Sequence, residues 1–387
     1  MKKKVLYPLL ENAINKEDVR IGINVIKSKY LTMSKITRKF EKYFAKYFDV
    51  KYAVMVNSGS SANLLSVFVA KYAYKLKKGD EVIIPSLCWS TSLWPIIQAG
   101  LKPIFVDVNL NDFNASLSQI YSKINSKTKA ILLVHVLGTS LKIDELKKNI
   151  KKKNILIIED TCESLGSKYN NKFLGTFGNF GTFSFYYSHQ ITSGEGGMIV
   201  TNSKRNYNLL KIMRAHGWDR DLNNKKNTQF NFINMGFNLR PLEVSAAIGH
   251  NQLKRLKLFS SVRAKNREKI INSLKAHPNW KNQYYFVIPD KKLKPSWFGL
   301  PFLLTKKYVK YKGTLINNLN KNGIETRPII SGNFLNQKAS KIHNLNPKAV
   351  KFPIANYIEK AGFFIGLHTK NISPKMLSKL TKTLLKF

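Results

Sequence analysis

Short apolar runs alternate with longer polar or amphipathic stretches along most of this 387-residue chain. A short apolar run bounded by turn-forming residues is typical of a buried strand, whereas apolar residues spaced three and four apart indicate a helix. Strands that alternate with helical stretches are characteristic of a parallel sheet with right-handed crossovers. The predicted strands of this sheet are 52–56, 81–85, 104–108, 130–136, 154–158, 182–187 and 198–200.

The two ends of the chain follow a different pattern. Residues 11–48 are polar and helical, with Phe40, Phe44 and Phe48 on one face, which we attribute to core packing. Residues 241–276 form a long, mostly helical segment. Beyond it we expect strands at 297–304 and 323–330 and helices at 309–319 and 374–385. We therefore predict a large α/β domain over residues 1–250, and a linking helix with a small α+β domain over residues 251–387.

The net charge of +43 raises the possibility of nucleic-acid binding. Most of the excess is lysine spread along the whole chain, whereas recognition surfaces favour arginine because its planar fork suits phosphate. We attribute the charge to a general lysine bias or to the attraction of a small anionic substrate, and expect no nucleic-acid partner.

Membrane insertion and export are not expected. No apolar run approaches the roughly 20 residues that a membrane helix needs. The basic start at residues 1–4 is followed by an apolar run too short for a signal peptide. We therefore expect a cytoplasmic protein that does not bind a membrane.

The chain contains two cysteines, Cys88 and Cys162. They do not form a disulfide framework, and they cannot supply the four thiolates that a two-iron cluster normally takes. We expect neither an iron–sulfur cluster nor another metal site.

The segment 181–200 reads GTFSFYYSHQITSGEGGMIV. Its alternating strand stops at Ser188 and His189, passes a small polar loop, and resumes as a second strand. His189 therefore lies on a turn at a strand end, where rigid scaffolds often carry their chemistry. Taken alone, a histidine in this position can equally be a structural residue.

Other polar or aromatic residues also follow predicted strands. The small residues at 57–63 precede a helix expected from about Leu64, an arrangement that suits an anion. Trp89 can stack on a flat ring. Asp160 follows an Ile/Leu run at the edge where α/β sheets bind ligands. From the residues alone, an ordinary turn, a core tryptophan and a helix-capping aspartate remain open alternatives.

Together these stretches resemble the DegT-type sugar aminotransferases, which are fold-type I enzymes that use pyridoxal phosphate. The resemblance runs nearly the full length, with its most specific motifs between Asn57 and Arg240. It implies a large domain with a mainly parallel sheet flanked by helices, and a smaller α+β C-terminal domain. In most of the family a lysine takes the place of His189 and binds the cofactor covalently as a Schiff base. Here no lysine lies between Lys172 and Lys204.

The resemblance also assigns roles around the cofactor. Gly59, Ser60 and Ser184 match phosphate-binding positions, and Trp89 matches the residue that stacks on the ring. Asp160 matches the partner of the pyridine nitrogen, which keeps the ring protonated as an electron acceptor. Glu163 stands where ordinary aminotransferases commonly have glutamine.

Further matches concern the substrate and the partner subunit. Asn238, in the segment 236–241, matches an asparagine that reaches the phosphate across the interface of a homodimer with shared active sites. Ser188, His216, Arg220 and Arg327 match positions near the sugar. The long polar stretch that includes 223–231 is expected to be a mobile element over the site.

The histidine variant looks like the sugar 3-dehydrases, which hold pyridoxamine or pyridoxal phosphate non-covalently. We therefore hypothesise a dehydratase of dideoxysugar biosynthesis for surface polysaccharide. It would remove the C3 hydroxyl of a nucleotide-linked 4-keto-6-deoxy sugar, with His189 as the base and L-glutamate regenerating the cofactor. A nucleotide-sugar 4-aminotransferase and a non-catalytic nucleotide-sugar-binding relative remain alternatives. The sequence leaves the nucleotide and the sugar stereochemistry open.

Overall fold

The computed structural model describes residues 5–10, 13–222, 230–346 and 350–387. The basic start at residues 1–4 and most of the asparagine-rich stretch, residues 223–229, lie outside the described residues. Among the described residues, no helix has the length and apolar character needed to cross a membrane.

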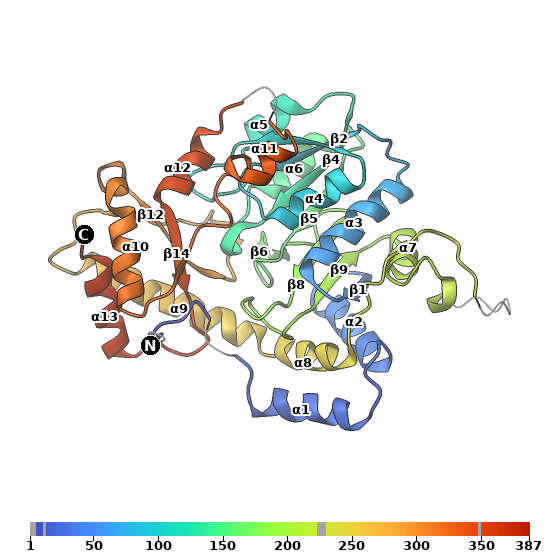
Figure 1. Ribbon diagram of the computed structural model, residues 1–387, viewed down its shortest axis with the longest axis horizontal. Coiled ribbons are helices and arrows are strands. Elements are labelled where there is room, and N and C mark those ends of the chain that lie inside the picture. The colour runs from blue at the N-terminus through green and yellow to red at the C-terminus, as the bar shows by residue number, and fades with distance from the viewer. Residues whose placement is uncertain (1–4, 11–12, 223–229, 347–349) are drawn as a thin grey trace.

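A seven-stranded sheet forms the centre of the molecule (Figure 1). Its order is β1-β9-β8-β5-β4-β2-β3, and β9 is antiparallel to both of its neighbours while the other pairs are parallel. The sheet is therefore mainly parallel, as predicted. The strands are β1 (Tyr52–Val56), β2 (Glu81–Pro85), β3 (Lys102–Val106), β4 (Thr128–Val134), β5 (Leu156–Asp160), β8 (Phe180–Ser184) and β9 (Gly197–Thr201).

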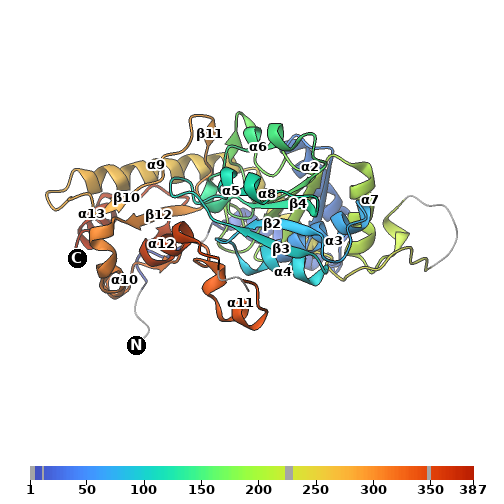
Figure 2. The same ribbon diagram turned by 90° about the horizontal axis from the view of Figure 1, so that it is seen from above.

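Successive side chains along the strands point to opposite faces of the sheet, and a layer of helices covers each face. Leu132 and Ile158 pack in the cluster that includes α3 (Gly59–Ala73) and α4 (Ser90–Gln98). Their neighbours Ile131 and Ile157 point to the opposite face, because successive strand residues alternate in direction. There they meet α5 (Leu117–Lys123) and α6 (Ile143–Ile150). Figure 2 shows α3 and α4 on one side of these strands and α5 and α6 on the other.

The N-terminal helices close the sheet at the end that carries β1. Of these, α2 (Lys35–Tyr47) contacts β1, as does α7 (Lys204–Arg214) after β9, while α1 (Lys16–Lys27) packs against the helix that begins at Glu243. Phe40, Phe44 and Phe48 are fully buried, and the ring of Phe44 lies 5.2 Å from that of Phe183 on β8. The predicted core role of this phenylalanine stripe is confirmed.

Two helices occupy the segment predicted as one long helical stretch. They are α8 (Glu243–Leu253) and α9 (Leu256–Lys275), which follow one another across the lower half of the view in Figure 1, above α1. The helical prediction is correct, but a turn at Lys254 and Arg255 interrupts it. α9 carries the chain from the central sheet to the C-terminal part.

The C-terminal part is built on a four-stranded sheet of order β10-β12-β14-β13. Its elements are β10 (Tyr284–Tyr285), β12 (Gly299–Leu304), β13 (Thr326–Arg327), β14 (Gly362–Gly366), α10 (Lys312–Lys321), α12 (Pro353–Ala361) and α13 (Pro374–Leu384). The strand predicted at 323–330 is shortened to β13, because Pro328 has no N–H to donate and Ile330 takes a left-handed conformation with φ 50°. The strand β14 was not predicted.

Short elements join the two parts of the molecule. β11 (Leu293–Lys294) pairs with β6 (Lys168–Tyr169), which pairs with β7 (Lys172–Phe173). The remaining elements are α11 (Lys338–Ile342) and 3₁₀ helices at Val136–Gly138, Asp219–Asp221, Lys306–Tyr311 and Phe334–Asn336. The boundary between domains at residues 250 and 251 stays a prediction.

Candidate active site

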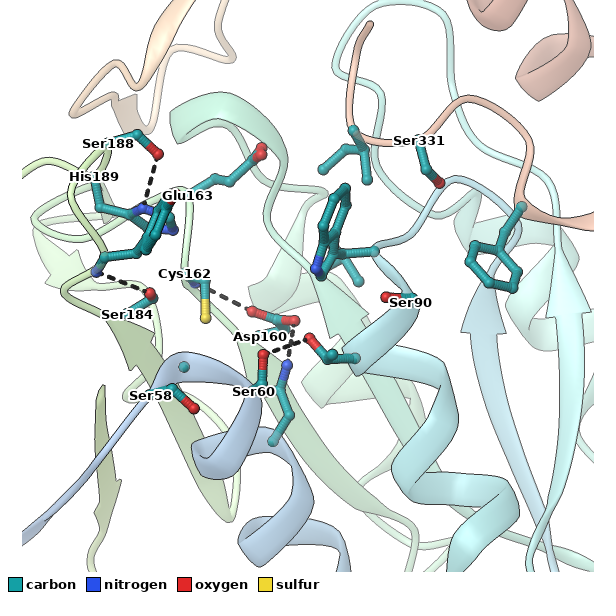
Figure 3. Close-up of a pocket in the computed structure, with 18 of the residues that line it drawn as sticks. Ser58, Ser60, Ser90, Asp160, Cys162, Glu163, Ser184, Ser188, His189 and Ser331 are labelled. Atoms are coloured by element: carbon teal, nitrogen blue, oxygen red, sulfur yellow. Dashed lines mark hydrogen bonds between the residues drawn. The ribbon is translucent and has the colours of Figure 1, made fainter. Parts of the chain in front are cut away.

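A cavity of about 920 Å³ opens where the central strands end. Parallel strands present their carboxyl ends at one edge of a sheet, which is where open α/β sheets bind ligands. The volume is that of a site for a cofactor or other small molecule. Nine of the twelve site residues proposed from sequence line it: Gly59, Ser60, Trp89, Asp160, Glu163, Ser184, Ser188, His189 and Arg327. Figure 3 shows Glu163, Ser188 and His189 on one side of this cavity and Ser60 and Asp160 below them in the view.

The first turn of α3 forms one wall of the cavity. Ser58 caps the helix by accepting a hydrogen bond from the backbone N–H of Ser61 at 3.1 Å. The helix therefore begins at Gly59, earlier than the predicted start near Leu64. The first turn of a helix leaves backbone N–H groups without intrahelical acceptors, so these small residues present an anion-binding end rather than a preceding loop.

Gly59 permits a close approach between α3 and β8. A Cβ on residue 59 would lie 2.5 Å from Cβ and 2.9 Å from Oγ of Ser184. Both distances are shorter than real non-bonded contacts. The glycine therefore lets the helix start and the Ser184 hydroxyl face the same small volume.

Asp160, the last residue of β5, is buried and held by three donors. Asn63 Nδ2 and Ser92 Oγ each donate to Oδ2 at 2.7 Å, and the backbone N–H of Cys162 donates to Oδ1 at 3.1 Å. Thr182 Oγ1 donates to Asn63 Oδ1 at 2.6 Å, which fixes the amide with its N–H groups toward the carboxylate. These bonds orient a carboxylate at the edge of the cavity.

Neither Asn63 nor Ser92 was identified from sequence as a support of Asp160. Asn63 lies inside the small-residue motif at 57–63, so only its role was missed. Ser92 lies in the first turn of α4, and no pattern in its own segment sets it apart.

Trp89 directly precedes α4 and lines the cavity. Its side chain is 55% exposed, so the alternative of a core tryptophan is wrong. Beside it, Ser60 Oγ donates to Thr91 Oγ1 at 3.2 Å and ties the start of α3 to that of α4. An indole ring is thus available to a flat ligand.

His189 lies on the turn between β8 and β9, and its backbone N–H donates to the carbonyl of Tyr186 at 3.0 Å. The imidazole stands edge-on to the rings of Tyr186 and Phe298, with centroid distances of 5.9 and 5.1 Å. Ser188 Oγ lies 3.4 Å from Nδ1. Neither Tyr186 nor Phe298 was expected from sequence, and Phe298 comes from a distant segment.

Electrostatics keep this imidazole neutral. Burial, together with the positive charges of Arg263 and Arg327, lowers the pKa of His189 to about 3. A neutral imidazole carries a free lone pair on one ring nitrogen and can accept a proton. A phosphate or diphosphate group bound nearby would raise this pKa, because negative charge favours the imidazolium.

Glu163 supplies a second titratable group. Its Oε2 accepts a hydrogen bond from the backbone N–H of Leu137 at 3.0 Å. Burial raises the pKa of Glu163 to about 7, and the Asp160 carboxylate adds to the shift, while the Leu137 N–H and Arg327 oppose it. A carboxyl group that titrates near neutral pH can donate or accept a proton in a reaction.

The C-terminal part supplies the opposite wall. Arg327 on β13 lines the cavity with an exposed side chain. Ser331 Oγ donates to the carbonyl of Cys88 at 2.7 Å, and the backbone N–H of Phe334 donates to the carbonyl of Ser86 at 2.8 Å. These bonds tie the turn after β13 to the segment before Trp89, so both parts of the chain enclose one cavity (Figure 3).

His216, Arg220 and Asn238 do not line this cavity. His216 donates its backbone N–H to the carbonyl of Phe237 at 2.8 Å, and its φ of 64° is left-handed. The Arg220 guanidinium lies 4.2 Å from the ring centroid of Trp218. Asn238 Oδ1 accepts from Arg240 Nε at 3.1 Å. The structure therefore separates these three residues from the other nine.

Within the described ranges, no group of three or more His, Cys, Asp or Glu side chains is arranged to hold a metal ion. Cys88 is buried and Cys162 is half-buried, and both are free thiols. Cys162 lines the cavity beside Asp160 (Figure 3).

The sequence profile of the DegT/DnrJ/EryC1/StrS aminotransferase family matches residues 12–380 of this chain. The chain belongs to this family. Its central sheet, flanking helices and C-terminal α+β part form the fold-type I architecture of pyridoxal-phosphate-dependent transferases, as predicted.

Relatives within the family are similar over nearly their whole length. GDP-4-keto-6-deoxy-D-mannose 3-dehydratase of Escherichia coli O55:H7 is 41% identical, covering 94% of this chain and 95% of the relative. The structure of the E. coli 3-dehydratase with bound hydrated PLP has a TM-score of 0.90 at 38% identity, covering 99% of this chain and 100% of that chain. A structure of GDP-4-keto-6-deoxymannose-3-dehydratase with a trapped PLP–glutamate geminal diamine has a TM-score of 0.89 at 38% identity, covering 98% and 100%.

Proposed function

We propose that this member of the family is a dehydratase that removes the C3 hydroxyl of a nucleotide-linked 4-keto-6-deoxy sugar. The observation that carries the proposal is His189, a neutral base on the cavity at a position where an aminotransferase needs a lysine amine. A histidine can move protons but cannot hold a cofactor covalently as a lysine does. The names of the two 3-dehydratase relatives support a GDP-linked substrate.

The residues around the cavity fit pyridoxamine or pyridoxal phosphate. The first turn of α3 with Ser184 suits the phosphate, because Gly59 brings helix N–H groups and a hydroxyl together. The Asp160 carboxylate, fixed by Asn63 and Ser92, suits a protonated pyridine nitrogen. Trp89 presents an exposed ring for stacking.

When bound, the cofactor supplies an electron sink that makes the loss of a proton and of the C3 hydroxyl feasible. His189 takes the proton at Nε2, since Nδ1 faces Ser188 Oγ. The same nitrogen then returns it to the departing hydroxyl group. A positioned base of this kind contributes about 100- to 10,000-fold to the rate. Glu163, with its pKa of about 7, stands on the same side of the cavity and can exchange a proton with the bound ring.

We further propose that the cofactor is held without a covalent bond and is renewed by L-glutamate. Support for the donor comes from the relative trapped with a PLP–glutamate adduct. Arg327 can bind a carboxylate of the donor through its guanidinium fork. With two cysteines in the whole chain, we propose that no iron–sulfur cluster takes part.

We also propose a homodimer with shared active sites. Asn238, His216 and Arg220 lie away from the cavity of their own chain, and the resemblance to the family assigns Asn238 to the phosphate of the other subunit. In a dimer, the Asn238 side chain of one subunit would reach the cavity of the other. Its Nδ2 group, which has no hydrogen-bond acceptor among the described residues, could then donate to the phosphate.

The function is tested by mass spectrometry of the product. The protein is incubated with pyridoxal phosphate, L-glutamate and GDP-4-keto-6-deoxymannose, with the CDP- and dTDP-linked 4-keto-6-deoxy sugars in parallel. A 3-deoxy-4-keto sugar formed with release of ammonia is expected. A retained amino group on C4 would instead identify a 4-aminotransferase, the activity that the family name suggests. Binding without any turnover would identify a non-catalytic relative.

A further inference from the structure

The imidazole of His189 is held by few bonds of its own. Among the described residues, Ser188 supplies the one side-chain hydrogen-bonding contact to the imidazole, with its Oγ 3.4 Å from Nδ1. The rings of Tyr186 and Phe298 contact the imidazole edge-on, but ring contacts of this kind do not hold its nitrogens in one direction. A lysine at this place would be tethered by its bond to the cofactor, and a histidine is not. The main chain of residue 189 must therefore carry much of the positioning.

We propose that Arg263 is a positioning residue for the His189 base, and that it locks the base-bearing turn to the C-terminal part of the chain. This inference rests on the proposed function for its kinetic consequences but not for its structural ones. The main-chain N–H of His189 is already bound within the turn, to Tyr186. The main-chain carbonyl is the remaining point of attachment.

Arg263 reaches that carbonyl from helix α9. Its side chain is 4% exposed, and Nη2 donates to the carbonyl of His189 at 3.4 Å. The same guanidinium donates through Nε to the carbonyl of Leu367, directly after β14, at 3.0 Å. One rigid, planar group therefore bridges the base-bearing turn and the end of a strand in the C-terminal sheet.

The two anchor points are themselves fixed. Gln190 is fully buried, and its Nε2 donates to the carbonyls of Glu163 at 2.5 Å and Ser296 at 3.2 Å. On the other side, Asn266 lies one turn further along α9 and donates to the carbonyls of His368 and Lys370. Arg263 thus joins two segments that are each held by other hydrogen bonds. Without Arg263, the turn 186–190 would lose its attachment to α9 at His189.

The charge of Arg263 acts in the same direction as its geometry. The charged groups that act on the imidazole are Arg263 from α9 and Arg327 from β13, and Tyr186 and Ser188 contact it from its own turn. Glu163, after β5, lines the same cavity. The two guanidinium groups disfavour a third positive charge. Arg263 therefore helps to keep His189 in the form that accepts a proton, while it holds the backbone beneath it.

The test compares Arg263→Gln with Arg267→Gln. Arg267 is a matched control on the same helix, where Nη2 donates to the carbonyl of Val287 at 2.5 Å and the guanidinium stacks 4.2 Å from the ring centroid of Trp297. Hydrogen–deuterium exchange is measured first, without cofactor or substrate. We expect the amides of residues 186–190 to exchange about tenfold faster in Arg263→Gln and at the wild-type rate in Arg267→Gln.

Kinetics supply the second readout. Arg263→Gln should lower kcat for dehydration by about 10- to 100-fold, because misplacing a base by about 1 Å costs that much. The dissociation constant of pyridoxal phosphate should stay within about twofold, since its predicted contacts with Gly59, Ser60, Trp89, Asp160 and Ser184 all lie outside the turn 186–190. Arg263→Lys, which keeps the charge and one bond, should recover part of the rate. It also replaces Arg263→Gln if that variant does not fold.

Unchanged exchange in residues 186–190 would overturn the inference, as would a loss of rate that parallels a loss of cofactor affinity. Equal effects of the Arg263 and Arg267 substitutions would also overturn it, because they would indicate general destabilisation. If exchange rises only in Arg263→Gln but the wild-type protein dehydrates none of the sugars, the positioning role stands and the proposed function fails.

Discussion

Replacing Gly59 with alanine tests how closely the proposed phosphate site is built. The added Cβ would lie 2.5 Å from Ser184 Cβ, 2.9 Å from Ser184 Oγ and 3.1 Å from Cys162 Sγ. Non-bonded carbon atoms normally rest about 3.5–4.0 Å apart, so the start of α3 and the end of β8 must separate by roughly 1 Å. The nearest of the three atoms, Ser184 Cβ, is bonded directly to the backbone of β8, so rotation of the side chain cannot relieve this contact.

The size of the effect follows from two opposing terms. Overpacking a tight contact costs about 1–3 kcal/mol, while alanine in a helix is better than glycine by about 0.5–1 kcal/mol. We expect a net loss of about 1–2 kcal/mol in the free energy of unfolding. The same separation moves the helix N–H groups away from Ser184, and we expect pyridoxal phosphate to bind about 10- to 100-fold more weakly.

Urea unfolding and an absorbance titration with pyridoxal phosphate measure the two quantities. Gly313→Ala is the control, because Gly313 also lies in the first turn of a helix, α10, and its added Cβ meets no atom within 4 Å. It should bind the cofactor normally and be as stable as the wild type or slightly more so. Wild-type affinity in Gly59→Ala would refute the assignment of the phosphate to this site.

Three further predictions concern the base, the second acid and the dimer. His189→Lys should abolish dehydration and give a protein whose mass, after borohydride reduction, includes pyridoxal phosphate; dehydration at the normal rate would exclude His189 as the base. Because the pKa of Glu163 is raised in the folded state, its protonated carboxyl group stabilises the fold relative to the ionised form. This stabilisation is fully present below about pH 4.5 and is lost as the pH rises through about 7. Glu163→Gln should therefore gain stability relative to the wild type between pH 5 and pH 8 in urea unfolding, and a constant difference would contradict the shift. An equimolar mixture of His189→Asn and Asn238→Ala subunits should recover about a quarter of the wild-type activity, since random pairing makes about half of the dimers mixed and one of the two sites in each mixed dimer keeps both groups. No recovery would place Asn238 in the site of its own subunit.

Much of the cavity could be anticipated from strand positions alone. Trp89, Asp160, Ser184 and His189 each end or follow a strand of the central sheet. Because the carboxyl ends of parallel strands lie at one edge, residues far apart in sequence were expected to meet there, and the structure does bring them together. Their chemical roles rest on resemblance and remain predictions.

Other features depended on contacts that no local pattern records. The helix α3 begins at Gly59 because Ser58 caps it and β8 leaves room for a residue without Cβ. The strand β14 forms between two glycines because β12 and β13 supply partners on both sides. His216 and Arg220 were predicted near the substrate, but they do not line the cavity of their own chain. Asn238 was predicted to reach the cavity of a partner subunit, and that role stays a prediction.

The sequence by itself determined the alternating strands and helices, the family, and the presence of a histidine where a lysine is usual, because each is encoded by residues near one another. The tertiary structure decided the pKa of that histidine. Arg263 and Arg327 approach His189 from α9 and β13, Phe298 confines it, and burial removes water, so its pKa falls to about 3. Electrostatic energy depends on distance and solvent exposure in space, and neither follows from position along the chain.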